Sequence, residues 1–154
     1  MLHARPVSLF SWDYRVVDGT LPVARIERSR FREPGHLLLE EAAYAIRREK
    51  LLGGRFLLLR DGIVVASAEK LRAVRRRFLI VWDDARFVLE PASWLSRRFV
   101  LYHDGDPIGT IRPARRLSRH TLVDLPDTLP LALRLFVLWL VLLLWKRSVD
   151  HAAG

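Results

Sequence analysis

The residue types that most often carry chemistry are scattered along this chain rather than clustered. None of its five histidines lies at the short spacing from another that a helical metal-ligand pair requires. The run His103-Asp104-Gly105-Asp106 offers metal-binding side chains, yet an Asp-Gly dipeptide is more typical of a hairpin turn. The chain contains no cysteine, which excludes disulfides and thiolate metal sites. These residues therefore predict neither a metal site nor a cofactor.

Motifs of nucleophilic and phosphate-transfer catalysis are also missing. No glycine-rich phosphate loop and no Gly-x-Ser-x-Gly elbow occurs in the sequence. Asp83-Asp84 is a pair of carboxylates, but neighbours in a turn are usually just solvated. The tryptophans are expected to supply bulk to a core or an interface: Trp12, Trp82, Trp94, Trp139 and Trp145. We therefore expect no catalytic residues and a protein that is not an enzyme.

Positive charge is the clearest compositional signal. The chain has 26 Lys and Arg against 17 Asp and Glu, a formal net charge of +9. Such an excess suits an anionic partner, which could be a membrane surface, a nucleic acid or an acidic protein. Nucleic acid is the less favoured partner, because few aromatic residues interleave with the arginines as base-stacking surfaces require. The first residues form no signal peptide, so we expect a cytoplasmic protein with a peripheral place at the membrane.

Short β-strands separated by turns are predicted for most of the chain. The dipeptides Asp18-Gly19, Asp61-Gly62 and Asp104-Gly105 are strong hairpin signals, because glycine tolerates the positive φ of a tight turn. No amphipathic helix interrupts the series, which argues against a parallel α/β sheet. The expected strands cover about residues 13–17, 21–31, 36–40, 43–50, 54–60, 63–71, 77–82, 86–90, 98–103, 107–112 and 119–123. Residues 7–10 are expected to form either a twelfth strand or the start of the first.

The last part of the chain predicts one strongly apolar helix over about residues 128–148, followed by a disordered tail at 149–154. The run from Leu129 to Trp145 is apolar on every face and is interrupted only by Pro130 and Arg134. A helix of this kind is buried on every side, either in a protein core or in a bilayer. Its length lies at the short edge of the roughly 17–25 residues that span a membrane. Taken alone, the helix slightly favours a membrane span over a protein core.

The strands favour the core alternative. Several of them carry large apolar residues, so the sheet needs a second layer, and this helix is the only candidate. About twelve strands, ~4.8 Å apart and tilted by ~40°, close into a barrel of roughly 12 Å radius. A helix with its side chains is about 10–12 Å across and fills such a barrel. We therefore predict a single domain over residues 1–154, a mainly β fold, in which a closed antiparallel barrel of 11–12 strands surrounds the hydrophobic C-terminal helix.

This order of elements resembles the tubby C-terminal-like superfamily, which includes tubby domains, phospholipid scramblases and LURP-one-related proteins. The phrases that carry the resemblance are Trp12-Asp13-Tyr14, Tyr44-Ala45-Ile46-Arg47-Arg48-Glu49, Phe56-Leu57-Leu58 with Asp61-Gly62, Ala66-Ser67-Ala68, Arg98-Phe99-Val100-Leu101, and Gly105 with Ile108-Gly109. The resemblance implies a barrel around a central helix and a lipid- or membrane-associated binding module. The headgroup-binding residues of tubby domains and the calcium-binding segment of scramblases have no match here, and neither site is carried over.

Charge alternates between successive turns of the predicted meander. Acidic turns contain Asp18, Glu40-Glu41, Asp61, Asp83-Asp84, and Asp104 with Asp106, and the turns between them are rich in arginine. Because successive turns of a meander lie at opposite ends of a barrel, this pattern predicts one anionic and one cationic rim, unless it is a coincidence of an arginine-rich sequence. The candidate anion-binding residues of the cationic rim are Arg75, Arg76, Arg77, Arg97, Arg98, Arg115, Arg116 and Arg119.

Arg134 is the single charge inside the apolar helix, and a buried guanidinium is costly unless it is paired. We expect it to contact a carboxylate or backbone carbonyls at the acidic end. Our leading hypothesis is a non-enzymatic barrel that binds anionic phospholipid headgroups or a membrane surface. The first alternative is a single-pass protein anchored by its C-terminal helix, and the second is a basic nucleic-acid-binding domain. The residues do not indicate which lipid is bound or the oligomeric state.

Overall fold

The computed structural model describes residues 1–28, 34–49, 54–71 and 76–153, and this part of the chain forms twelve strands and one helix. The elements are β1 (Leu2–Pro6), β2 (Tyr14–Asp18), β3 (Leu21–Glu27), β4 (Gly35–Leu39), β5 (Ala43–Arg48), β6 (Phe56–Arg60), β7 (Ile63–Lys70), β8 (Phe78–Trp82), β9 (Ala85–Pro91), β10 (Phe99–His103), β11 (Asp106–Pro113), β12 (Thr121–Asp124) and α1 (Leu131–Ala153).

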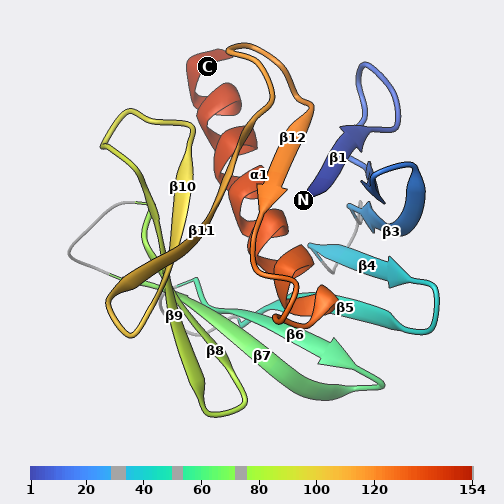
Figure 1. Ribbon diagram of the computed structural model, residues 1–154, viewed down its shortest axis with the longest axis vertical. Coiled ribbons are helices and arrows are strands. Elements are labelled where there is room, and N and C mark those ends of the chain that lie inside the picture. The colour runs from blue at the N-terminus through green and yellow to red at the C-terminus, as the bar shows by residue number, and fades with distance from the viewer. Residues whose placement is uncertain (29–33, 50–53, 72–75, 154) are drawn as a thin grey trace.

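The strands form a closed meander barrel (Figure 1). Each strand pairs antiparallel with the next one in sequence, and β1 pairs with β12 in a register that places Leu2 opposite Val123. Alternate residues of a strand point to opposite faces, as in β8, where Phe78 and Ile80 are fully buried and Leu79 is partly exposed. The predicted mainly β fold with a closed antiparallel barrel and one C-terminal helix is confirmed.

Helix α1 passes through the barrel. Its residues from Leu133 to Leu142, apart from Arg134, are at most 5% exposed, and they belong to the same apolar cluster as the inward side chains of the strands. A helix that packed on the outside of a closed barrel would expose one of its faces. The all-round apolar pattern is therefore explained by burial in the barrel core.

Among the described residues, no helix combines the length and the sustained hydropathy that a membrane crossing needs.

Two glycines allow close packing inside the fold. A Cβ atom at Gly35, the first residue of β4, would lie 2.6 Å from the indole Nε1 of Trp139 on α1. A Cβ atom at Gly109 of β11 would lie 2.4 Å from the backbone oxygen of Asp124, at the end of β12. A side chain at either place would push the helix or the last strand away from its neighbour.

Two segments differ from the sequence-based expectation. The additional strand is β1 at Leu2–Pro6, whereas residues 7–10, which were expected to form it, belong to a loop closed by a hydrogen bond from the backbone N–H of Val7 to the carbonyl of Asp13 (2.9 Å). Helix α1 begins at Leu131 and continues to Ala153, where a disordered tail was expected. The extension is supported by an i,i+4 ion pair between Lys146 and Asp150.

Candidate functional site

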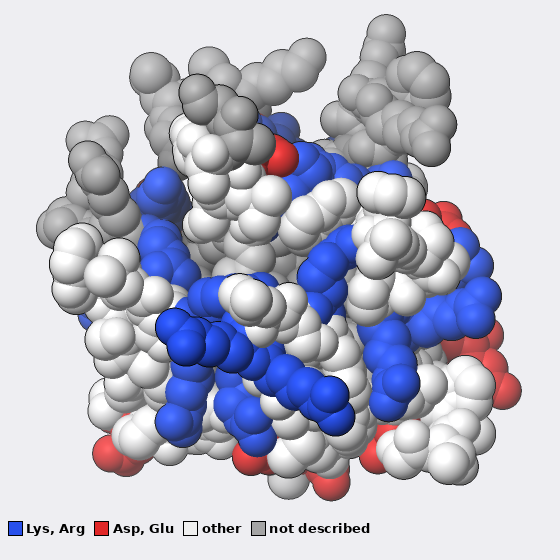
Figure 2. Space-filling view, turned by 90° about the horizontal axis from the view of Figure 1, so that it is seen from above, with Lys and Arg blue, Asp and Glu red and all other residues white. Residues whose placement is uncertain are grey.

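The two ends of the barrel carry opposite charge. Helix α1 starts at the end formed by the acidic turns and finishes among the arginine-rich loops, which we call the basic end. In Figure 1 this end lies uppermost, and Figure 2 views it from above, with Lys and Arg side chains interspersed among uncharged surface and most acidic side chains at the edge. The basic end is therefore the natural place to look for an anion-binding site.

Three loops of the basic end share one backbone architecture. We call them the Ser loops: residues 7–13 between β1 and β2, 92–98 between β9 and β10, and 114–120 between β11 and β12. In each, the first N–H donates to the carbonyl six residues later, as in Val7 to Asp13 (2.9 Å), Ala92 to Arg98 (2.8 Å) and Ala114 to His120 (2.7 Å).

A serine stabilises each Ser loop from the inside. Its Oγ accepts a hydrogen bond from the N–H two residues later, from Asp13 to Ser11 (2.9 Å), from Arg98 to Ser96 (3.0 Å) and from His120 to Ser118 (2.9 Å). Local bonds of this kind hold a loop without any regular secondary structure. Each loop also follows a proline that stands five residues before its serine, at Pro6, Pro91 and Pro113.

The tips of the Ser loops expose large apolar side chains. Phe10 is 91% exposed, Trp94 82% and Leu117 90%, and Leu9 and Leu95 are exposed beside them. Contiguous exposed apolar residues on a soluble domain usually mark an interaction surface. Sequence reasoning missed these residues, because Leu9 and Phe10 were assigned to a strand and Trp94 to a core or interface. The repeated proline-to-serine spacing was the signal that could have identified the loops.

Arginines connect neighbouring loops of the basic end. Arg76 donates to the carbonyls of Trp94 (3.2 Å) and Ser96 (2.7 Å) in the next loop. Arg97 donates in turn to the carbonyl of Arg116 (3.0 Å). Arg119 completes the chain by donating to the carbonyls of Leu9 (2.8 Å) and Ser11. We call Arg76, Arg97 and Arg119 the bracing arginines, because each holds the adjacent Ser loop.

An aromatic ring lies beneath each bracing arginine. The guanidinium carbon of Arg76 lies 4.9 Å from the ring centroid of Phe99, on β10. The guanidinium carbon of Arg97 lies 4.8 Å from the ring centroid of Trp145, on the last buried turn of α1. That of Arg119 lies 4.4 Å from the ring centroid of Trp12 and 5.7 Å from that of Tyr14. Cation–π contacts at such distances stabilise a charge that has lost part of its hydration. They also join the loops to the helix and the barrel core.

A groove of about 770 Å³ lies between the Ser loops and the end of α1. Its apolar wall is formed mainly by Leu9, Phe10, Leu95, Leu117, Trp145 and Val149. The bracing arginines, Tyr14 and Ser148 supply polar side chains. The hydroxyl of Tyr14 is buried and makes no hydrogen bond of normal geometry with the described residues, although Arg119 lies close enough to act on it. A mostly apolar groove with a few converging polar groups is the usual composition of a small-molecule site.

Burial perturbs the ionisable groups of the groove. It raises the pKa of Tyr14 above its usual value, although the positive charge of Arg119 acts in the opposite direction. Burial also lowers the pKa of Arg76 and of Arg97. Desolvated cations of this kind gain from the arrival of an anion more than hydrated ones do.

The other predicted anion-binding residues take different positions. Arg77 forms an ion pair with Glu90 on β9 (3.2 Å). Arg98, Arg115 and Arg116 are exposed, and their guanidinium groups make no hydrogen bond or ion pair in the part of the chain that the structure describes. Arg75 lies outside the described residues. The seven arginines of this set that the structure describes therefore divide by role, and Arg98, Arg115 and Arg116 remain directed to solvent.

Arg134 lies at the opposite, acidic end. Its side chain is 12% exposed, its Nε donates to the carbonyl of Leu129 (3.1 Å), and its Nη1 lies 3.6 Å from an oxygen of Asp127. Both partners belong to the segment that leads into α1. The segment before α1 therefore stabilises the charge of Arg134, and this side chain has no contact with the groove.

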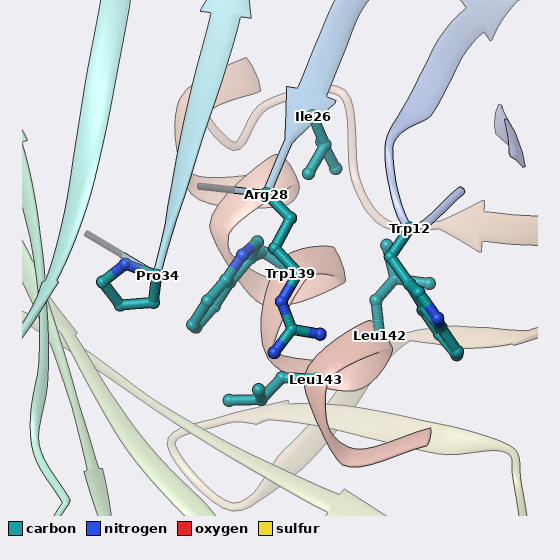
Figure 3. A pocket seen from close by; sticks show the side chains of 7 residues that line it. All are labelled: Trp12, Ile26, Arg28, Pro34, Trp139, Leu142 and Leu143. Atoms are coloured by element: carbon teal, nitrogen blue, oxygen red, sulfur yellow. The ribbon is translucent and has the colours of Figure 1, made fainter. Parts of the chain in front are cut away.

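A second, smaller pocket of about 20 Å³ lies beside the groove. Figure 3 shows the side chain of Arg28 reaching between the rings of Trp12 and Trp139, above Leu143. A volume of this size holds about one water molecule. This pocket is therefore too small to bind an organic ligand.

Comparisons of the chain with protein-family models, with curated proteins and with solved structures found no match. The described residues hold no group of three or more His, Asp or Glu side chains arranged to bind a metal ion. The resemblance to tubby-like barrels therefore remains a prediction from the sequence. The groove and the loops of the basic end are the features of this structure that indicate a function.

Proposed function

We propose that this protein is a non-enzymatic barrel that associates peripherally with anionic membranes through its basic end. The observation that carries the proposal is the set of exposed apolar tips, Phe10, Trp94 and Leu117, among arginines directed to solvent. Apolar side chains gain by entering the boundary between headgroups and acyl chains, and the arginines gain from anionic headgroups. Cytoplasmic leaflets carry such headgroups, in keeping with the expected location.

The geometry suits shallow insertion. The three tips come from separate loops that surround the end of α1, and the bracing arginines hold those loops to one another. A rigid set of tips loses little conformational entropy on docking, so more of its burial energy contributes to binding. Each arginine near the surface adds about 1 kcal/mol of electrostatic attraction. Arg98, Arg115 and Arg116 are the described residues of the predicted set that are available for this role.

The same surface is less suited to nucleic acid. Base stacking needs aromatic rings among the cations, whereas Leu9, Leu95 and Leu117 are aliphatic. Aliphatic tips next to Phe10 and Trp94 instead match the mixed apolar and aromatic composition of membrane-interface surfaces. The resemblance to tubby-like and scramblase-like proteins supports the same reading as an independent sequence-based expectation.

The proposal is tested by sedimentation with vesicles of phosphatidylcholine, with and without about one third phosphatidylserine. We expect binding that requires phosphatidylserine and weakens with salt, because screening reduces surface attraction. The triple variant Phe10→Ser, Trp94→Ser and Leu117→Ser should lose sedimentation while its melting temperature is retained. The double variant Arg115→Gln and Arg116→Gln should bind more weakly and with less dependence on salt.

The acidic end provides a matched control. Leu21 and Ile63 are 65% and 68% exposed in the hairpins of that end, so Leu21→Ser with Ile63→Ser removes exposed apolar side chains from the opposite end of the barrel, two rather than three. This variant should sediment like the wild type. Equal losses in the two apolar variants would contradict the proposed orientation. Wild-type protein that ignores these vesicles but binds a single-stranded oligonucleotide would show that the nucleic-acid alternative is correct.

A further inference from the structure

We infer that the groove at the basic end binds one single-chain lipid anion, an acyl chain that ends in a carboxylate or a phosphate. The acyl chain lies along the apolar wall, and the head group lies at Tyr14 and Arg119. This inference rests on the proposed membrane association, because the loop tips that dock on the membrane also form the mouth of the groove.

The size and composition of the groove suit a lipid chain. Its volume of about 770 Å³ lies within the ~300–1,000 Å³ that is usual for small-molecule sites. The apolar lining includes the tips at Leu9, Phe10 and Leu95 together with Trp145 and Val149 on α1. A chain that covers this wall removes apolar surface from water at both partners, by about 25 cal/mol for each Å².

Unsatisfied polar atoms indicate where the head group lies. The hydroxyl of Tyr14 and the Nε atoms of Arg76 and Arg119 are buried, and none of them makes a hydrogen bond of normal geometry with the described residues. Buried polar atoms without partners are rare, because each costs the free energy of its lost hydration. All three belong to side chains that line the groove. An anion with several oxygens offers acceptors of the kind that these atoms lack.

Charge makes an anion the right acceptor. The bracing arginines, which include Arg97, place three guanidinium groups on the groove, and no Asp or Glu is among the side chains that line it. Their terminal nitrogens already hold loop carbonyls, which leaves the positive charge itself uncompensated. A neutral lipid would leave both the charge and the open hydrogen-bonding positions unsatisfied.

The test uses cis-parinaric acid, a fatty acid whose fluorescence rises in an apolar site, at submicellar concentration and without vesicles. We expect saturable binding, displaced by oleate or by oleoyl lysophosphatidic acid, with the tighter competitor identifying the head group. Inorganic phosphate should not displace the probe, and oleyl alcohol should be at least about tenfold weaker than oleate, since it lacks the charge. Tyr14→Phe should weaken probe binding by about tenfold for the loss of one charged hydrogen bond.

A pair of helix variants localises the ligand. Ala152 lines the groove and His151 does not, so Ala152→Trp should fill it and abolish probe binding, whereas His151→Trp adds the same bulk elsewhere and should bind normally. Ala152→Trp should still sediment with phosphatidylserine vesicles, because the loop tips are unchanged. Absence of saturable binding in the wild type, or unchanged binding in Ala152→Trp, overturns the inference. Displacement by oleyl alcohol as strong as by oleate overturns the assignment of the head group.

Discussion

The two ends of this barrel reverse the direction of the chain with different kinds of connection. At the acidic end, four of the five hairpins turn within two residues, as shown by the paired positions Asp18 with Leu21, Arg60 with Ile63, Trp82 with Ala85 and His103 with Asp106. At the basic end, the Ser loops use seven residues each, closed by backbone hydrogen bonds and joined by arginines.

This difference between short turns and long loops distinguishes connections that only join strands of the barrel from connections that form an exposed surface. Two-residue turns such as Asp61-Gly62, with φ values of 51° and 77°, match the twist of the strands and expose little beyond their own polar side chains. The longer Ser loops are not needed for pairing, yet they are held in defined shapes and display Phe10 and Trp94 to solvent. Ordered loops with exposed apolar tips indicate binding rather than closure.

The largest expected effect comes from removing helix α1, which runs from one end of the barrel to the other. A chain truncated after Thr128 lacks α1 and therefore the centre of the core. We expect it to lose cooperative unfolding, because the inward faces of all twelve strands would surround a void. Circular dichroism and differential scanning calorimetry measure this. A truncated chain that stays soluble and melts cooperatively would show that the barrel does not need its helix.

A glycine exchange at each end should show a smaller difference. Gly35→Ala places a methyl group 2.6 Å from the indole nitrogen of Trp139, and such overpacking costs about 1–3 kcal/mol. Gly62→Ala, in an acidic-end turn, meets no atom within 4 Å and suffers only the strain of its φ of +77°, about 1 kcal/mol. Urea unfolding should rank the two variants in this order. The reverse order would mean that the turns, rather than the helix contact, limit stability.

Two arginines of the loop at residues 114–120 have different roles. Arg119 holds a neighbouring loop, whereas the side chain of Arg116 is exposed to solvent. Arg119→Ala removes the donor to the carbonyls of Leu9 and Ser11 and should destabilise the protein by about 1–3 kcal/mol. Arg116→Ala should change the free energy of unfolding by less than about 0.5 kcal/mol, because only its backbone carbonyl makes a bond within the fold. Hydrogen exchange should also speed up in residues 7–13 in the first variant alone. Equal effects would mean that Arg119 does not brace that loop.

The smallest effect concerns pH at the seam between β1 and β12. His3 Nδ1 lies 3.0 Å from His120 Nε2, and burial, followed by Arg5, His3 and Arg115, lowers the pKa of His120. The unfolded chain therefore binds the proton more readily than the folded one. The contribution of His120 to the free energy of unfolding is fully present above its unfolded pKa of about 6.5. This contribution is lost as the pH falls from there toward the folded pKa. His120→Gln should flatten this part of the plot of melting temperature against pH. An unchanged plot would mean that other groups cause the pH dependence of stability.

Much of the fold could be predicted because its signals are local. Alternation within β8, the dipeptides Asp61-Gly62 and Asp104-Gly105, and the all-apolar helix each depend on neighbouring residues. Asp18-Gly19 is a partial exception, because Asp18 pairs with Leu21 and the turn itself uses Gly19-Thr20. The end of α1 was missed, since the residues that line the groove there, Val149 and Ala152, are recognised only in the folded barrel.

The site was less predictable, since it depends on which partner each side chain meets. The sequence indicates a cluster of arginines, but Arg97 and Arg98 look alike until one is found holding a neighbouring loop and the other facing solvent. The exposure of Trp94 was likewise hidden, because a tryptophan in a sequence usually indicates burial. These distinctions are tertiary, and they arise from loops that are distant in sequence meeting at one end of a closed barrel.

The position of α1 after all twelve strands has a consequence for synthesis. At about 5–20 residues per second, the 23 residues of the helix take roughly 1–5 s to translate, and every strand is made before them. During that time the inward faces of the sheet have nothing to surround, and the pairing of β1 with β12 has no core to stabilise it. The nascent strands therefore expose apolar surface that is prone to aggregate until the helix has been made.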